Sequence, residues 1–354
     1  MFRILLCLLS GLPVTGLAGT SAANPCLAVT AACAEPLPLQ VSGKWVRLYR
    51  TYSLNKRNAD VVRAFILVHG MLRDADSHFR TAIAAGLLAG RLDDTIIIAP
   101  RFASSTASPG SKAGGCGDLL DAGEASWTCD APRLAAWRSG GPEVSTPGLS
   151  SFDVIDALIA RLSDRNVFPN LAKIVVAGHS AGGQYVVRYA MVTTAVPRPG
   201  VTVSYIVANP SSYPYLDAWR PKDRALLTPR DAATDFGTYE RAAKCATYNH
   251  WPYGLDYRSG YAARLEPGAL VRQFVNRPVT YLLGDADVLT TGTLDESCAA
   301  KAQGNSRLVR GRAFADYVRG RFHARHDIVT VPDCGHNARC MFTADVSLPI
   351  MFPD

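Results

Sequence analysis

Short apolar runs rich in Val and Ile alternate along the chain with stretches whose apolar residues recur at helical spacing. Residues 64–70 (AFILVHG) precede a helical pattern over 78–92, and residues 172–178 (AKIVVAG) precede another over 181–190. Strands this short and apolar are buried on both faces, so the pattern predicts an α/β fold: a mostly parallel central sheet with helices on both sides. The other predicted elements are a helix at 152–162 and strands at 95–100, 201–209, 279–284 and 326–331.

Two segments interrupt this alternation. Residues 103–149 are rich in Gly, Ser, Pro and Ala, and residues 211–270 carry many aromatic and charged residues with weak periodicity. Neither segment has a recognisable core of its own, and the chain shows no internal repeat. We therefore expect a single domain over residues 24–354, with both segments as loop or cap insertions over one edge of the sheet.

The N-terminus has the composition of a secretory signal peptide. Arg3 precedes an apolar run over residues 4–9, and small residues lead to Ala22 and Ala23, where we expect cleavage. The alternative, a buried N-terminal helix, is disfavoured by helix breakers at positions 11, 13 and 16. We therefore expect residues 1–23 to be removed and the protein to be secreted or periplasmic. No later stretch approaches the roughly 18 apolar residues of a membrane helix, so no stable membrane insertion is expected.

The cysteine pattern is typical of an exported protein. Of nine cysteines, eight remain once Cys7 leaves with the signal peptide, and an oxidising compartment favours four disulfides. Eight cysteines allow about 105 connectivities, among which the sequence does not choose. None of the neighbouring pairs has the close spacing of a common zinc site, so metal ligation is the weaker interpretation. The neighbouring pairs are Cys26 with Cys33, Cys116 with Cys129, Cys245 with Cys298, and Cys334 with Cys340.

The formal net charge of +7 is compatible with binding to acidic surfaces, but it does not identify a partner. The densest basic stretch, residues 306–322, has apolar residues near helical spacing. We interpret it as an amphipathic helix whose arginines lie on the outer face. No nucleic-acid-binding motif accompanies the charge, so no nucleic-acid partner is expected. The sequence leaves the oligomeric state open.

A serine stands between glycines where a predicted strand meets a predicted helix. Residues 178–182 (GHSAG) match GxSxG, a pattern that places the serine on a tight strand-to-helix turn at the carboxyl end of a sheet. By itself the pattern also fits an ordinary glycine-rich turn. The strand before it and the helix after it favour the first interpretation, so Ser180 is the candidate nucleophile.

A serine nucleophile needs a base to take its proton and an acid to orient that base. His336 follows the predicted strand 326–331, whereas the other histidines lack this position or stand where a backbone role is expected. His336 is therefore the candidate base, with an ordinary surface histidine as the alternative. Two candidate acids, Asp285 and Asp287, follow the predicted strand 279–284.

The segments around these candidate residues resemble those of the α/β-hydrolase superfamily, and within it those of the secreted bacterial and fungal serine esterases and lipases. The resemblance implies that Asp287 is the acid, because in the family the acid commonly follows a glycine by three positions. It also implies an oxyanion hole formed by the backbone N–H groups of Met71 and Ala181. The HGGG form of the oxyanion loop is absent. The matching stretches are ILVHGM (66–71), VVAGHSAGG (175–183), YLLGDAD (281–287) and DCGHNA (333–338).

Three functions fit these residues. The first is hydrolysis of a small or polymeric carboxylic ester through an acyl-Ser180 intermediate, which the resemblance favours. The second is peptide or amide cleavage by the same residues, and the third is a non-catalytic binding module on a hydrolase fold. No cofactor and no metal is expected.

Aromatic residues in the two insertions could line a substrate pocket, but we expect most of them to pack loops against the sheet. They are Trp127, Trp137, Tyr213, Tyr215, Trp219, Trp251, Tyr253 and Tyr257.

Overall fold

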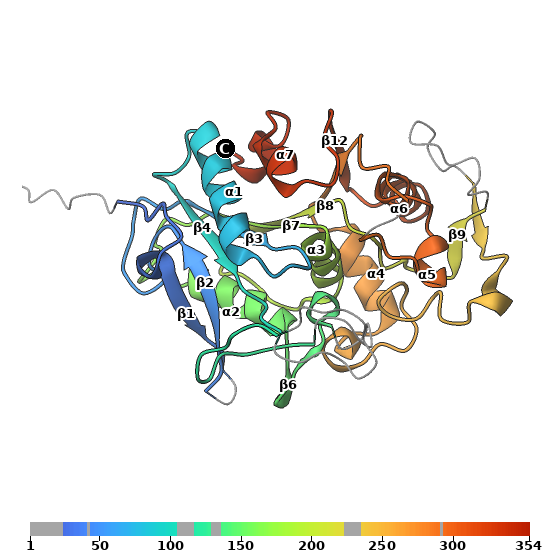
Figure 1. Ribbon diagram of the computed structural model, residues 1–354, viewed down its shortest axis with the longest axis horizontal. Coiled ribbons are helices and arrows are strands. Elements are labelled where there is room, and N and C mark those ends of the chain that lie inside the picture. The colour runs from blue at the N-terminus through green and yellow to red at the C-terminus, as the bar shows by residue number, and fades with distance from the viewer. Residues whose placement is uncertain (1–23, 41–42, 105–116, 129–135, 223–234, 291–292) are drawn as a thin grey trace, which may run out of the picture.

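The computed structural model describes residues 24–40, 43–104, 117–128, 136–222, 235–290 and 293–354. Its central sheet has eight strands in the order β1-β2-β4-β3-β7-β8-β11-β12 (Figure 1). The strands from β4 to β12 pair in parallel, whereas β1 pairs antiparallel with β2 and β2 antiparallel with β4. The strands are β1 (Ala34–Pro38), β2 (Trp45–Arg50), β3 (Arg63–Val68), β4 (Thr95–Pro100), β7 (Lys173–His179), β8 (Thr202–Ala208), β11 (Val279–Gly284) and β12 (Asp327–Val331).

Helices cover both faces of this sheet, as the sequence predicts. Helices α1, α7 and α8 pack on one face, and α2, α3, α4 and α6 contribute to the larger core on the other. In Figure 1, α1 and α7 lie together above the sheet. The helices are α1 (Ala75–Leu88), α2 (Phe152–Leu162), α3 (Ala181–Val192), α4 (Pro267–Val275), α5 (Cys298–Lys301), α6 (Arg307–Phe322), α7 (Ala338–Thr343) and α8 (Leu348–Met351). Short 3-10 turns are η1 (Ala31–Cys33), η2 (Trp137–Ser139), η3 (Ala242–Lys244) and η4 (Gly260–Ala263).

The two interrupting segments contain small structures of their own. The first holds the hairpin of β5 (Pro142–Glu143) and β6 (Thr146–Ser150), and the second holds β9 (Trp219–Pro221) paired with β10 (Phe236–Thr238). Part of the second segment packs with α5 into a minor apolar cluster that includes Tyr239 and Tyr253. The division into one domain with two insertions stays a prediction.

Three predicted cysteine pairs are disulfides in the structure: Cys26–Cys33, Cys245–Cys298 and Cys334–Cys340. The predicted pair of Cys116 with Cys129 lies outside the described residues, as do residues 1–23. Among the residues that the structure describes, no helix combines the length and the apolar character needed to cross a bilayer.

The basic stretch forms the expected helix, α6, but the expected position of its arginines is wrong in two cases. Arg307 and Arg310 are each only 1% exposed. Arg310 donates to the carbonyl oxygens of Gly304 (3.0 Å), Ser211 (2.5 Å) and Asp295 (2.9 Å), which compensates the cost of burying its charge. Helical spacing alone does not distinguish buried, hydrogen-bonded arginines from solvent-exposed ones, because a hydrophobicity pattern counts every arginine as polar.

Candidate active site

Ser180 lies in the sharp turn between β7 and α3. Its backbone has φ 59° and ψ −116°, a conformation that non-glycine residues rarely adopt. The turn is tight because the chain passes close to β3: a Cβ on Gly182 would lie 2.3 Å from the carbonyl oxygen of Val68. Only glycine fits there, so the residues around Ser180 enforce the turn that presents its hydroxyl at the carboxyl edge of the sheet.

His336 reaches Ser180 from the loop that follows β12. Its Nε2 lies 2.9 Å from the Oγ of Ser180, and its Nδ1 lies 2.7 Å from Oδ2 of Asp287. The Cys334–Cys340 disulfide closes the loop around the histidine. The structure therefore brings Ser180, His336 and Asp287 into one hydrogen-bonded chain, and the imidazole connects the hydroxyl to the carboxylate.

The structure separates the two candidate acids. β11 ends at Gly284, as predicted, and the Asp287 N–H donates to the carbonyl of Gly284 (3.2 Å). A Cβ on Gly284 would lie 2.2 Å from the carbonyl oxygen of Cys334, which brings this strand end against the His336 loop. Asp287 is completely buried, whereas Asp285 is exposed. Only Asp287 contacts the histidine.

The second oxygen of Asp287 faces a buried cation that the sequence analysis missed. Nη1 of Arg307 lies 3.6 Å from Oδ1 of Asp287, and this oxygen has no hydrogen bond within the described part of the chain. The guanidinium is held by the hydroxyls of Ser211 (3.2 Å) and Thr293 (3.0 Å). Burial lowers the pKa of Arg307, while the charge of Asp287 opposes this change. The arginine thus compensates a carboxylate that is otherwise buried away from solvent.

His179 is a second neighbour of His336. The two rings lie with centroids 4.5 Å apart. Burial, followed by the nearby His336, holds the pKa of His179 well below its ordinary value, so this ring is neutral at physiological pH. His179 therefore packs against His336 without adding a charge. This contact was not predicted, although His179 adjoins Ser180 in the sequence.

Met71 and Ala181 lie at the same site as Ser180. Neither backbone N–H donates to another backbone group within the described residues. Ala181 is the first residue of α3, where helix N–H groups have no partner inside the helix. Both N–H groups are therefore available to an anionic oxygen. A pocket of about 530 Å³ opens beside Met71 and Ser180, and its other lining residues include Leu72, Ser77, Arg80, His179, Thr293, His336, Ala338 and Arg339.

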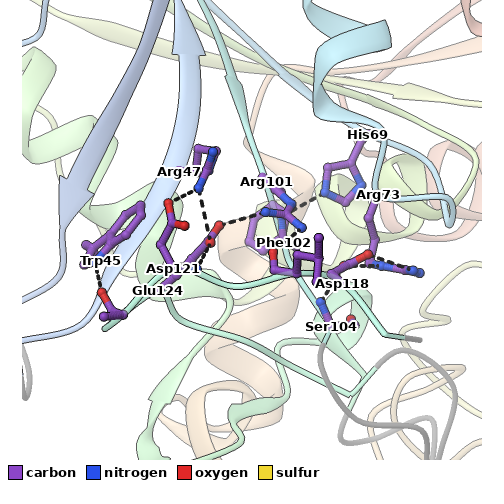
Figure 2. Close-up of polar contacts among 12 residues, drawn as sticks. Trp45, Arg47, His69, Arg73, Arg101, Phe102, Ser104, Asp118, Asp121 and Glu124 are labelled. Carbon is purple, nitrogen blue, oxygen red and sulfur yellow. Dashed lines mark hydrogen bonds and ion pairs between the residues drawn. The ribbon is translucent and has the colours of Figure 1, made fainter. Parts of the chain in front are cut away.

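His69 has the backbone role that its position after β3 suggests. The Phe102 N–H donates to its Nε2 (2.9 Å), so the proton lies on Nδ1, which donates to the Gly70 carbonyl (2.8 Å). Figure 2 shows the imidazole reaching across to Phe102. Burial lowers the pKa of His69 to about 4, which keeps the ring neutral. The loop beside Ser180 is therefore fixed to the end of β4.

Most of the aromatic residues of the insertions pack internally, as expected. The described lining of the Ser180 pocket contains none of the eight. Tyr257 is exposed, while Trp219 is partly buried and packs against the main core. Within the described ranges, no three His, Cys, Asp or Glu side chains gather closely enough to hold a metal ion. The buried aromatics are Trp127, Trp137, Tyr213, Tyr215, Trp251 and Tyr253.

Comparison with known proteins agrees with this fold. A family model described as the alpha/beta hydrolase family matches residues 65–346, so the chain belongs to that family. A poly(3-hydroxybutyrate) depolymerase from Bordetella parapertussis is 20% identical, with 91% of each chain covered and a TM-score of 0.57. Poly(aspartic acid) hydrolase-1 from Sphingomonas sp. KT-1 is also 20% identical, with 87% of this chain and 95% of that chain covered and a TM-score of 0.56. No curated protein sequence gives a significant match.

Proposed function

We propose that this protein is a serine hydrolase that cleaves carboxylic esters. The observation that carries the proposal is the hydrogen-bonded chain from the Ser180 hydroxyl through His336 to the buried carboxylate of Asp287. In that chain His336 accepts the serine proton on Nε2 while Asp287 fixes the proton on Nδ1. Ser180 attacks the ester carbonyl, and the negative charge of Asp287 stabilises the imidazolium that forms.

The tetrahedral intermediate places a negative charge on the former carbonyl oxygen. In the proposed mechanism, the backbone N–H groups of Met71 and Ala181 donate to this oxygen, a contribution of about 3 to 4 kcal/mol for one such donor. His336 then returns its proton to the leaving alcohol, and the acyl group stays on Ser180. A water molecule that His336 deprotonates attacks the acyl-enzyme and releases the acid.

We propose that the substrate is a small or polymeric ester with an apolar portion. Met71 and Leu72, on the lining of the Ser180 pocket, are 45% and 78% exposed, and such apolar surface suits an acyl chain. Two proteins of similar fold are described as acting on polymers, one as a poly(3-hydroxybutyrate) depolymerase and the other as a poly(aspartic acid) hydrolase. Amide cleavage remains the alternative, because it needs the same three residues and differs in the leaving group.

We also propose that the protein is exported after removal of residues 1–23. The three disulfides support this proposal, because disulfides persist mainly in oxidising compartments.

A substrate panel tests the proposed activity. Purified protein is assayed against p-nitrophenyl esters of increasing chain length, a water-insoluble polyester film and peptide anilides, beside Ser180→Ala as the matched inactive control. We expect turnover of esters by the wild type and none by the variant, which should fold normally because the hydroxyl contributes little packing. Hydrolysis of the anilides but not of the esters would show that the protein is an amidase and not an esterase. Equal activity in the variant would refute the mechanism.

A further inference from the structure

Hydrogen bonds hold the backbone carbonyls on both sides of the Met71 Cα, those of Gly70 and Met71. The Gly70 carbonyl accepts hydrogen bonds from Nδ1 of His69 (2.8 Å) and from the Arg73 N–H (3.2 Å). The Met71 carbonyl accepts one from Nη1 of Arg73 (2.9 Å). In a trans peptide the C=O and N–H bonds point in opposite directions, so fixing the Gly70 carbonyl also fixes the direction of the Met71 N–H. Arg73 holds this loop through both its backbone and its side chain.

Asp118 in turn holds Arg73, although 45 positions separate them in the sequence. Nε of Arg73 donates to one carboxylate oxygen (2.7 Å) and Nη2 to the other (3.2 Å), which is the forked geometry that fixes a guanidinium best. The Ser104 N–H donates to the same carboxylate (2.7 Å). Burial raises the pKa of Asp118, but the hydrogen bonds from Arg73 and Ser104 outweigh it and hold the pKa below its ordinary value. Arg73 itself has φ 58°, a strained conformation that such contacts must maintain.

The segment that carries Asp118 is fixed to the edge of the sheet. Glu124, which is 3% exposed, accepts a hydrogen bond from Nη1 of Arg101 (3.2 Å) and forms an ion pair with Arg47 of β2 (3.7 Å). The indole N–H of Trp45 donates to a backbone carbonyl of the same segment (3.0 Å). Figure 2 shows these contacts beside the separate group formed by Arg73, Asp118 and Ser104. Asp118 therefore lies on a segment that is joined to β2 and to the end of β4 by these contacts.

We propose that Asp118 and Arg73 are positioning residues that aim the Met71 N–H at the oxyanion, so that part of the first insertion governs transition-state stabilisation at Ser180. This inference rests on the proposed esterase function. It gives Asp118, in the first insertion, a role in the reaction, although Asp118 is not among the residues that line the Ser180 pocket.

The proposal predicts a specific kinetic signature. An oxyanion donor acts on the transition state and little on the bound ester, so a misaimed N–H lowers kcat and leaves KM nearly unchanged. Loss of one donor costs about 10² to 10³ in kcat, and a displacement of about 1 Å costs up to about 10². We expect Arg73→Gln and Asp118→Asn each to lower kcat about tenfold to hundredfold. A boronic acid inhibitor, which mimics the tetrahedral intermediate, should bind more weakly by a similar factor.

Asp121→Asn is the matched control. Asp121 lies on the same segment and forms an ion pair with Arg47 of β2, whereas Arg73 pairs with Asp118. The control should keep wild-type kcat and inhibitor binding. All values of kcat are expressed per Ser180 titrated with a fluorophosphonate, so that misfolded protein does not contribute. The double variant of Arg73 and Asp118 should be no worse than the more damaged single variant, because the two residues act as a unit.

Three results would overturn the proposal. They are wild-type kcat and inhibitor affinity in Arg73→Gln or Asp118→Asn, an equal loss in Asp121→Asn, or a loss confined to the titratable fraction with normal kcat per site. A wild-type protein without esterase activity would instead refute the proposed function and this inference with it, so the two failures are distinguishable.

Discussion

Replacement of Asp287 by Asn removes a charge and keeps the shape of the side chain. In the wild type, Oδ2 accepts from Nδ1 of His336 at 2.7 Å. An amide nitrogen placed there would donate to Nδ1 instead, so the imidazole proton would move to Nε2. A ring protonated on Nε2 does not accept the proton of Ser180. The variant should therefore bind substrate normally and acylate slowly.

The size of the effect follows from the lost charge. At a separation of about 4 Å and an effective dielectric constant of about 20, a carboxylate and an imidazolium attract each other by about 4 kcal/mol. That energy corresponds to a factor of about 10³ in rate. The wrong tautomer adds to this loss, and the combined effect in serine proteases reaches about 10⁴. We expect kcat to fall by about two to four orders of magnitude.

Stability must be measured beside activity in this variant. Arg307 lies 3.6 Å from the other oxygen of Asp287 and is 1% exposed, so neutralising the carboxylate leaves a buried cation without its counter-charge. Breaking a buried pair in this way costs about 3 to 5 kcal/mol. Urea unfolding measures the loss of stability, and thermal unfolding gives the temperature range in which the variant is folded. Turnover of p-nitrophenyl esters is compared with the wild type within that range.

Asp285→Asn is the matched control, since Asp285 is exposed and lies two positions away. It should retain activity within a few-fold of the wild type. If Asp285→Asn were the more damaged enzyme, the assignment of the acid to Asp287 would be wrong, although the assignments of Ser180 and His336 would survive.

Three further predictions concern the surroundings of the site. Arg307→Met should lower the free energy of unfolding by about 3 to 5 kcal/mol, because it leaves the buried Asp287 without its cation; an unchanged urea midpoint would contradict the pairing. The pKa of His69 is about 4 in the folded protein and near 6.5 in the unfolded chain, so between these pH values the unfolded state binds more protons. The free energy of unfolding therefore falls as the pH drops through this range. Urea unfolding of His69→Asn at several pH values should show a change in the free energy of unfolding that is about 3 kcal/mol smaller than in the wild type. An equal pH dependence in the two proteins would contradict this prediction. Removal of the Cys334–Cys340 disulfide by double replacement with Ser should cost about 2 kcal/mol by chain entropy and lower kcat, whereas wild-type turnover would show that the loop positions His336 without it.

The central sheet could be predicted from the sequence because its strands are buried on both faces. β3 and β4 are buried along their whole length, which makes each a continuous apolar run. β1 and β2 were not predicted, since their buried and exposed residues alternate and β1 contains two prolines. Strands that alternate in this way or contain proline give a weaker signal than a continuous apolar run.

The site was predictable to the extent that it follows the strand ends. Ser180, Asp287 and His336 each follow a strand of the parallel sheet, so topology alone brings them to one edge. Arg307 was not predictable as the partner of Asp287, because its helical pattern gives no information about which charges are buried. Asp118 was equally hidden, since it lies in an insertion without periodicity and acts through a contact 45 positions away.

Covalent labelling of the nucleophile tests the central claim most directly. Wild-type protein is treated with a fluorophosphonate, digested, and mapped by mass spectrometry, with Ser180→Ala and His336→Ala treated in parallel. The proposed mechanism predicts a single phosphonylated residue, Ser180, with no label in Ser180→Ala and much slower labelling in His336→Ala. A stable label on another residue, or labelling of Ser180→Ala at the wild-type rate, would contradict the assignment of Ser180 as the nucleophile.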